Sequence, residues 1–359
     1  MQQKQYQLEQ IDSHILAIAP IEQQHALIIL TLQGTLYHFN LQQHQLTAIT
    51  TLELPPLNNG KDHFYHPPCY ALHVSKQGLY VAIVVDFGQF GQVIELATGD
   101  VALHMDTQNY HEDTVPFSLA FSTLEQDEIV IYRSDWNRLE SYNLSQKCST
   151  TTRHIAPYER ENRPEHYLDY FHGALYVSPN DEYILDDGWV WQPYAVPHLW
   201  SLPTWLMQNP FESEDGASLQ AVIFDEEDWD YPMCWLDNQR FALWHTQRDR
   251  YEHMPDQHES MPCLHLRICQ ILANKSLQTS IWQMPEQRQK LFHIYADQDK
   301  ILIIGNENIS LYDLNHQQLI AQIPNNFRQK QHIKRQSLWA FQHTQLIEIY
   351  YGNMDSSDA

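Results

Sequence analysis

The sequence predicts an all-β protein, a seven-bladed β-propeller, and two observations lead to that prediction. The first is a strand–turn–strand segment that occurs seven times, each copy having an apolar strand, a polar turn and a second apolar strand. The second is the spacing of the copies, roughly 45 to 60 residues, close to the period of propeller blades with long loops. Since four antiparallel strands make one blade, seven copies favour seven blades over six or eight.

The seven copies cover the whole chain. They are LAIAPIEQQHALIIL from Leu16, LHVSKQGLYVAIVV from Leu72, LAFSTLEQDEIVIY from Leu119, LYVSPNDEYILDD from Leu175, MCWLDNQRFALWH from Met233, FHIYADQDKILIIG from Phe292 and LWAFQHTQLIEIYY from Leu338. A third strand follows most copies, as in GTLYHFNL, and an outer strand follows it, as in QLTAITTL. This order of strands is the one expected for a blade.

The last blade needs a strand from the other end of the chain. The seventh copy ends near Tyr351, and the remaining GNMDSSDA is too short and polar for two further strands. We therefore expect residues 4–10 to form the missing outer strand, which would leave no open sheet edge between the two ends of the chain. Residues 1–351 are then a single β-propeller domain, and residues 352–359 a short polar C-terminal tail.

Composition restricts the partners. The chain has 21 Lys and Arg against 45 Asp and Glu, a formal charge of −24, which repels nucleic acid and anionic membranes and favours a basic protein partner. The N-terminus lacks the basic-then-apolar order of a secretory signal, and the five cysteines are odd in number with no CxxC pair. We expect an acidic protein of the cytoplasm with reduced thiols.

Two stretches resemble a known family. VSPNDEYIL followed by HLWSL, and ADQDKILII followed by ISLYDL, resemble the inner strands of WD-repeat β-propellers. The resemblance implies the fold alone, because the Gly-His and Trp-Asp signatures of that family are absent. The segment DDGWVW also resembles one in uncharacterised bacterial propeller-like proteins, which implies no particular activity.

The first candidate site is this DDGWVW segment, with Asp186, Asp187, Trp189 and Trp191. We expect the two acids to end a strand and the two tryptophans to lie in a loop on the face that collects the longest loops, where binding residues are common. Two interpretations are open for the indoles. Both pack between blades, or at least one faces solvent and anchors a partner.

The second candidate site is the loop DEEDWDY, formed by Asp225, Glu226, Glu227, Asp228, Trp229, Asp230 and Tyr231. It lacks the spaced acids, the glycine and the final glutamate of a calcium loop. It is either a solvated acidic loop or a surface that accepts Lys and Arg side chains, including over its aromatic rings. We expect both candidate loops to form one contiguous acidic and aromatic surface that binds the partner.

Motifs for catalysis are absent from the sequence. There is no GxSxG elbow, no HExxH pair and no Gly-rich phosphate loop among only 11 glycines, so we expect no catalytic residue, no metal site and no cofactor. The favoured function is a non-enzymatic protein-binding propeller, in its sharpest form an immunity protein that neutralises a basic bacterial toxin. Two alternatives stay open: a propeller hydrolase or lactonase with a divalent cation in the central funnel, and a general assembly scaffold with several partners.

Overall fold

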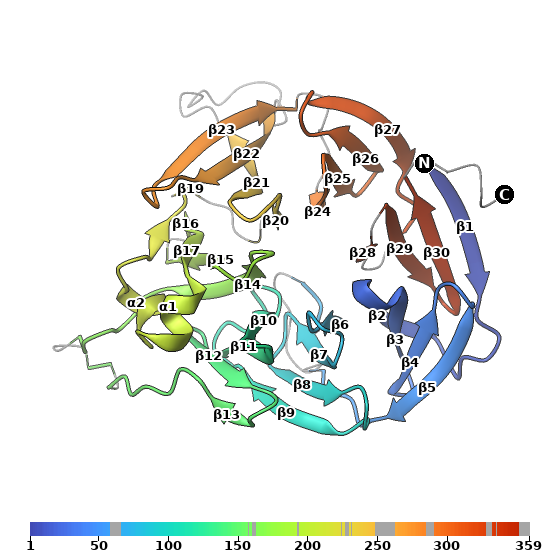
Figure 1. The fold of residues 1–359 in the computed structure, drawn as a ribbon, viewed down its shortest axis with the longest axis horizontal. Coiled ribbons are helices and arrows are strands. Elements are labelled where there is room, and N and C mark those ends of the chain that lie inside the picture. Colours follow the sequence, from blue (N-terminus) through green and yellow to red (C-terminus); the bar gives the residue numbers. More distant parts are fainter. Residues whose placement is uncertain are drawn as a thin grey trace, which may run out of the picture. The chain divides into compact units, whose positions relative to one another are not determined.

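The chain is a seven-bladed β-propeller in a computed structural model, and the prediction of its fold class is confirmed (Figure 1). The structure describes residues 1–57, 66–156, 158–159, 163–191, 194–223, 225–226, 230, 232–247, 263–284, 291–327, 332–334 and 336–351. Within these ranges the strands form seven sheets, six of four strands and one of six.

Five sheets follow the predicted order of inner hairpin, third strand and outer strand. They are β2 (Ile15–Ile21), β3 (Ala26–Thr31), β4 (Thr35–Asn40) and β5 (Gln45–Thr51); β6 (Cys69–Val74), β7 (Tyr80–Asp86), β8 (Phe90–Glu95) and β9 (Val101–Asp106); β10 (Leu119–Leu124), β11 (Asp127–Asp135), β12 (Arg138–Asn143) and β13 (Cys148–Ser149); β20 (Met233–Trp235), β21 (Arg240–Gln247), β22 (Cys263–Ile271) and β23 (Leu277–Gln283); and β24 (Leu291–Asp297), β25 (Lys300–Gly305), β26 (Asn308–Asp313) and β27 (Gln318–Pro324). In the first two of these sheets the second strand is the most deeply buried: every residue of β3 and of β7 is buried. Such continuous apolar runs form because both faces of the strand pack against other blades or strands.

The sheet at the two chain ends differs in detail from the prediction. β1 (Gln2–Gln7) pairs antiparallel with β30 (Gln345–Tyr350), so the N-terminal strand lies in the last sheet but covers residues 2–7 instead of 4–10. The hairpin of β29 (Ser337–Gln342) and β30 supplies the second and third strands, while the inner strand is β28 (His332–Lys334), which precedes the seventh copy of the repeat. Its three residues are too short to give a strand signal in the sequence.

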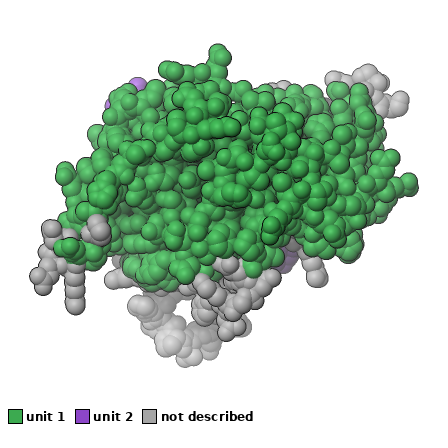
Figure 2. All heavy atoms as spheres, turned by 90° about the horizontal axis from the view of Figure 1, so that it is seen from below, with its two compact units in different colours: residues 1–177, 181–230, 327–359 green, residues 178–180, 231–326 purple. Residues whose placement is uncertain are grey.

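Contacts divide the chain into two compact units, which we describe separately. The first unit contains residues 1–177, 181–230 and 327–359, and the second contains residues 178–180 and 231–326 (Figure 2, green and purple). The sheets of β20–β23 and β24–β27 belong to the second unit, and the other five belong to the first.

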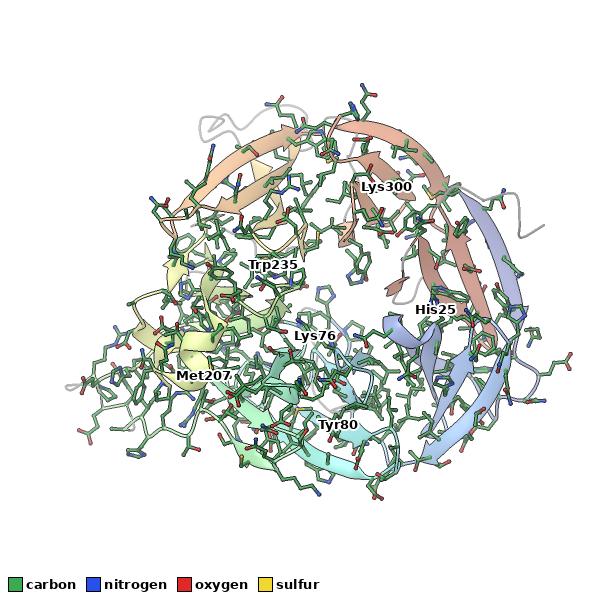
Figure 3. All side chains as sticks on the ribbon, viewed as in Figure 1. His25, Lys76, Tyr80, Met207, Trp235 and Lys300 are labelled. Carbon is green, nitrogen blue, oxygen red and sulfur yellow. The ribbon has the colours of Figure 1, made fainter. Side chains whose placement is uncertain are left out.

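Polar contacts between hairpin turns connect successive blades of the first unit. Lys76, in the β6–β7 turn and labelled in Figure 3, pairs with Asp181 at 2.7 Å. Ser122 and Thr123 donate hydrogen bonds to the same carboxylate at 2.7 and 2.8 Å. Gln23 reaches the carbonyl of Lys76 from the preceding blade at 2.9 Å. Side chains from four hairpins are thereby linked through short polar contacts, which fix the position of the blades that carry the candidate site.

Two further observations concern the surroundings of the protein. Among the described residues, none of the helices has the length and apolar character needed to span a membrane. Of the cysteines whose side chains are described, Cys69, Cys148, Cys234 and Cys269 are free thiols, the first two exposed and the last two buried.

Candidate functional site

The six-stranded sheet of the first unit contains the DDGWVW segment. It is built from β14 (Phe171–Val177), β15 (Tyr183–Val190), β16 (Tyr194–Ala195), β17 (His198–Ser201), β18 (Gln220–Ala221) and β19 (Asp225–Glu226), with helices α1 (Leu202–Met207) and α2 (Glu212–Asp215) between β17 and β18. β15 does not end at the two acids as we expected. It continues to Val190, because Trp189 pairs with Phe171 on β14 and with Ala195 on β16. The register between β14 and β15 shifts between Phe171 and Ala174, which is a bulge of the kind found near functional sites.

At this bulge, two buried side chains, His172 and Asp186, form a short hydrogen bond. His172 Nδ1 lies 2.6 Å from an Asp186 carboxylate oxygen, and the other oxygen accepts a hydrogen bond from the Gly173 backbone N–H at 3.0 Å. The exposed fractions of His172 and Asp186 are 1% and 0%. A charge buried to this degree requires such partners, since its desolvation is costly.

A buried arginine from the neighbouring sheet, Arg133, contacts this pair. Arg133 on β11 is 2% exposed and donates from Nη1 to the carbonyl of His172 at 3.2 Å. Burial lowers the pKa of Arg133 to about 10, and the nearby Asp186 carboxylate opposes that shift. The guanidinium therefore remains a cation at neutral pH and balances the acids around it.

Tyr170 and His198 pack beside these charges. Their rings are stacked with centroids 4.2 Å apart and an interplanar angle of 5°. Burial lowers the pKa of His198 to about 4 and raises that of Tyr170, so both rings are neutral at pH 7. The Tyr170 ring lies directly over Gly188, where a Cβ atom would come within 2.1 Å of it. Only glycine fits at that position of the DDGWVW segment.

We call Arg133, Tyr170, His172, Asp186, Asp187 and His198 the buried polar cluster. Asp187 is 1% exposed, so neither acid of the segment reaches the surface. This corrects the expectation that Asp186 and Asp187 contact a partner. Because the acids lie within the sheet, they support the site from below, and the surface above them is formed by aromatic residues.

The aromatic residues come from four different segments, and we call them the aromatic surface: Tyr110, His111, Trp136, Phe171, Trp189 and Trp191. Trp189 is 2% exposed and stacks on Phe171 with centroids 4.0 Å apart and an angle of 10°. Trp191 is 51% exposed and stands perpendicular to Trp189, at 5.5 Å and 85°. One indole therefore packs in the interior and the other faces solvent, and Trp191 is the exposed one. The side chain of Trp189 is not available to a partner.

The loop between β9 and β10 adds the second exposed ring. Tyr110 is 46% exposed. The ring of the half-buried His111 lies between it and Trp191, with its centroid 4.6 Å from that of Tyr110 and 5.1 Å from that of Trp191. Tyr110 also lies 5.6 Å from Trp136. The two exposed rings are thus held by further rings, so their positions are largely fixed before a partner binds.

Acidic residues occur in the same segments. Asp113 follows His111 by two residues, Asp135 directly precedes Trp136 and accepts a hydrogen bond from its backbone N–H at 2.7 Å, and the exposed Asp169 precedes Phe171 by two. An acidic rim around exposed aromatic faces suits a cationic side chain, which is attracted both by the carboxylates and by the ring faces.

The second candidate loop is described only in part. Antiparallel pairing of β16 with β19 sets Tyr194 opposite Glu226 and Ala195 opposite Asp225, so β16 lies between β15 and β19 in the sheet. Asp230 is half-buried. Glu227, Asp228, Trp229 and Tyr231 lie outside the described residues, as do the side chains of Asp225 and Glu226. That the two loops form one contiguous surface stays a prediction.

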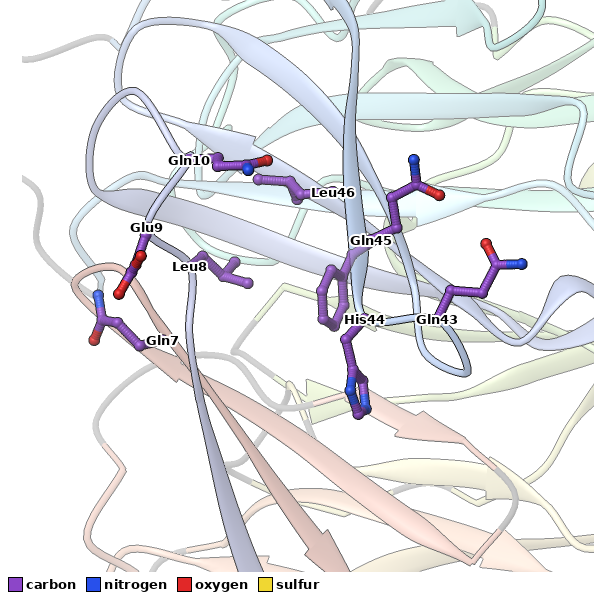
Figure 4. Close-up of a pocket in the computed structure, with 9 residues that line it drawn as sticks. Gln7, Leu8, Glu9, Gln10, Gln43, His44, Gln45 and Leu46 are labelled. Carbon is purple, nitrogen blue, oxygen red and sulfur yellow. The ribbon is translucent and has the colours of Figure 1, made fainter.

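A separate groove of about 630 Å³ lies in the first unit, between the end of β1 and the β4–β5 turn (Figure 4). Its lining is Gln7, Leu8, Glu9, Gln10, Phe39, Gln43, His44, Gln45 and Leu46. The groove shares no residue with the aromatic surface or the buried polar cluster. Among the described residues, no group of three or more His, Cys, Asp and Glu side chains has the arrangement of a metal site.

Several residues of the site were missed in the sequence. Arg133, His172, Tyr110 and His111 come from segments that lack any recognised motif. One signal was present: the stretch DYFHG, residues 169–173, contains Phe171, which pairs with Trp189 of DDGWVW in the hairpin register. Pairing these two stretches would have predicted the contact between Phe171 and Trp189.

Comparison with known proteins supports the fold and nothing finer. No protein-family model and no curated protein sequence matches the chain. Among solved structures, hydrazine synthase of Kuenenia stuttgartiensis superposes with a TM-score of 0.62 at 9% identity, covering 95% of this chain and 96% of that one. The Cps50 (Swd1) β-propeller domain of Myceliophteria thermophila superposes with a TM-score of 0.60 at 9% identity, covering 97% of this chain and 100% of that one. Virginiamycin B lyase from Staphylococcus aureus superposes with a TM-score of 0.55 at 12% identity, covering 97% of this chain and 98% of that one. At such low identity, likeness to proteins of varied function shows that this chain is similar to them in its propeller fold alone.

Proposed function

We propose that the protein is a non-enzymatic binding module that holds a basic protein partner on the aromatic surface. The observation that carries the proposal is the exposure of Trp191. Its indole side chain is 51% exposed to solvent, although three other rings pack against it. Trp is rarely left exposed without a partner, and Trp and Tyr are the residues most enriched at interface hot spots. Trp191 and Tyr110 are the two anchors.

Fixed rings favour tight binding. A side chain that is free in solution loses conformational entropy when a partner immobilises it, at a cost of about 0.5–1.5 kcal/mol each. Trp191 packs against His111, Phe171 and Trp189, so most of that entropy is already lost in the free protein. The buried polar cluster supports this arrangement from below, because His172 and Asp186 hold the strands that carry Phe171 and Trp189.

Charge selects the class of partner. Residues 231–326 contain eight Lys and Arg and ten Asp and Glu, a formal charge of −2, so −22 of the total −24 belongs to the rest of the chain, which carries the aromatic surface. A field of this sign accelerates the approach of a basic protein and slows that of an acidic one. A basic toxin whose active site is covered by this surface is the sharpest form of the proposal.

Trp191→Ala tests the proposal. Partners are captured from a lysate of the native host on the immobilised full chain and identified by mass spectrometry, and the rate constants of any enriched basic protein are then measured by surface plasmon resonance. Truncation of an anchor should raise the dissociation rate by a cost of about 2 kcal/mol or more, with little effect on the association rate. The association rate itself should fall as salt rises.

Met207→Ala is the matched control, since Met207 is 54% exposed on helix α1 of the same unit. It should leave both rate constants unchanged. If no basic protein is enriched, or if Trp191→Ala and Met207→Ala bind it equally well, the aromatic surface does not bind a basic partner.

A further inference from the structure

The outer strand of each blade ends its sheet, since no further strand pairs with its outer side among the described residues. An unprotected edge can pair with a strand of another chain, and folded proteins prevent this with bulges, charges or very short strands. The outer strands of the described blades can therefore be compared by the protection that each one carries.

Six of them carry one of these protections. The register of β5 skips Ile49, that of β9 skips Ala102 and that of β27 skips Ile320, which are bulges within the outer strand. β1 carries the charged Lys4, while β13 and β18 are two residues long. Each device interrupts or repels a strand that would add to that edge.

β23 carries none of them. All seven of its residues, Leu277–Gln283, pair with β22 in continuous register without a skipped position. Its sequence LQTSIWQ contains no charge and no proline. Trp282 is buried against Tyr312 with ring centroids 5.5 Å apart, whereas Ile281 is 51% exposed. This is a long, regular and uncharged edge.

We propose that β23 is a dimerisation edge, which pairs antiparallel with β23 of a second copy of this chain. An antiparallel edge is its own complement, because two copies related by a two-fold axis present identical free groups to each other. With the axis at Ser280, Ile281 of one copy lies opposite Thr279 of the other. Pairs of β-branched residues such as these are favourable across strands, and this register places no like charges opposite each other.

Charge distribution favours a second copy at this place. Two chains of −24 repel each other, and an interface within the strongly acidic part would bring the repelling charges to short range. β23 belongs to residues 231–326, whose formal charge is −2.

Ile281→Lys tests the proposal, because the residue is half exposed and the change puts two lysines diagonally across the shared axis. Sedimentation velocity of the full chain over a range of concentrations should show a dimer for the wild type and an increase in its dissociation constant of at least about tenfold for the variant. Leu319→Lys makes the same kind of change at the bulged edge of β27, where the residue is 47% exposed, and should leave the dimer intact.

Hydrogen exchange identifies the edge itself. In the wild-type dimer, alternate amides of β23 should exchange more slowly at high than at low protein concentration, and Ile281→Lys should remove that difference. A wild type that sediments as a monomer throughout, a dimer that Ile281→Lys leaves unchanged, or an edge protected only after addition of host lysate each overturns pairing with a second copy.

Discussion

The sheet of β2–β5 and the six-stranded sheet of β14–β19 are built on the same repeat, but their interiors differ. In the first, the buried residues are mostly aliphatic, as with Ile28 and Leu30 on the fully buried β3. In the second, the inner hairpin buries His172 and Asp186 and is extended by two helices and two extra short strands. The aliphatic sheet shows that the propeller repeat needs no buried charge.

The charges of the six-stranded sheet therefore require another reason. Buried ion pairs rarely stabilise more than apolar residues of the same volume would, because desolvation offsets much of their attraction. They do fix geometry, since each donor must meet its acceptor. His172 and Asp186 lie on the two strands that carry Phe171 and Trp189, and we interpret the charges as the support of the aromatic surface.

Asp186→Ala should have the largest effect of the variants that break this comparison. It leaves the buried guanidinium of Arg133 without its main counter-charge and the His172 ring without its hydrogen-bond partner, at an expected cost of about 3–5 kcal/mol in the free energy of unfolding. Urea denaturation measures this. Asp106→Ala, at an exposed acid of another sheet, should change stability by less than about 0.5 kcal/mol. Equal losses for the two variants would contradict the role of the buried polar cluster.

Gly188→Ala should have the second largest effect, about 2–3 kcal/mol, because the new methyl group overlaps the Tyr170 ring and forces it to move. The double variant Gly188→Ala with Tyr170→Leu sharpens the test. If the overlap is the cause, the double variant should lose less stability than the two single changes together, since each relieves the other. Strict additivity in urea denaturation would point to a backbone effect instead.

Ile28→Val in the aliphatic sheet should cost only about 1 kcal/mol, the price of one buried methyl group. The measurement is again the free energy of unfolding in urea. A loss as large as that of Asp186→Ala would show that the two sheets tolerate change equally poorly, and the contrast between them would fail.

The last prediction has no effect at neutral pH, because it concerns the dependence of stability on pH through His198. Its pKa is about 4 in the folded protein and about 6.5 when unfolded, so the unfolded chain binds the proton more strongly between these values. Stability is therefore unaffected above about pH 6.5 and decreases as pH falls towards 4. His198 is partly exposed, so solvent screening reduces the effect.

Thermal melts of the wild type and His198→Gln, recorded from pH 7 to pH 4, test this prediction. His293 in the other unit also has a pKa lowered to about 4 by burial and contributes with the same sign, so only the difference between the two proteins reports on His198. Parallel pH profiles for the two proteins would contradict the role assigned to His198.

Much of the fold could be predicted because its signals are local. Six of the seven hairpins lie where the apolar runs placed them, and the seventh differs only in its rank within the sheet, since β28 precedes it. Of the candidate site, the sequence indicated the DDGWVW segment and the possibility of one buried and one exposed indole. It misplaced the end of β15, because the bulge at His172 and Gly173 that extends the strand depends on another strand.

By itself, the sequence determined the repeat, the all-β class and the acidity, because alternating apolar strands and polar turns act over a few residues at a time. The burial of Asp186, the exposure of Trp191 and the gathering of Tyr110, His111 and Trp136 around Phe171 were decided only by the tertiary structure. The physical reason is that burial depends on which partners come from other strands and loops. An acid enters the interior only where a histidine and an arginine from elsewhere in the chain meet it, and no local pattern encodes that meeting.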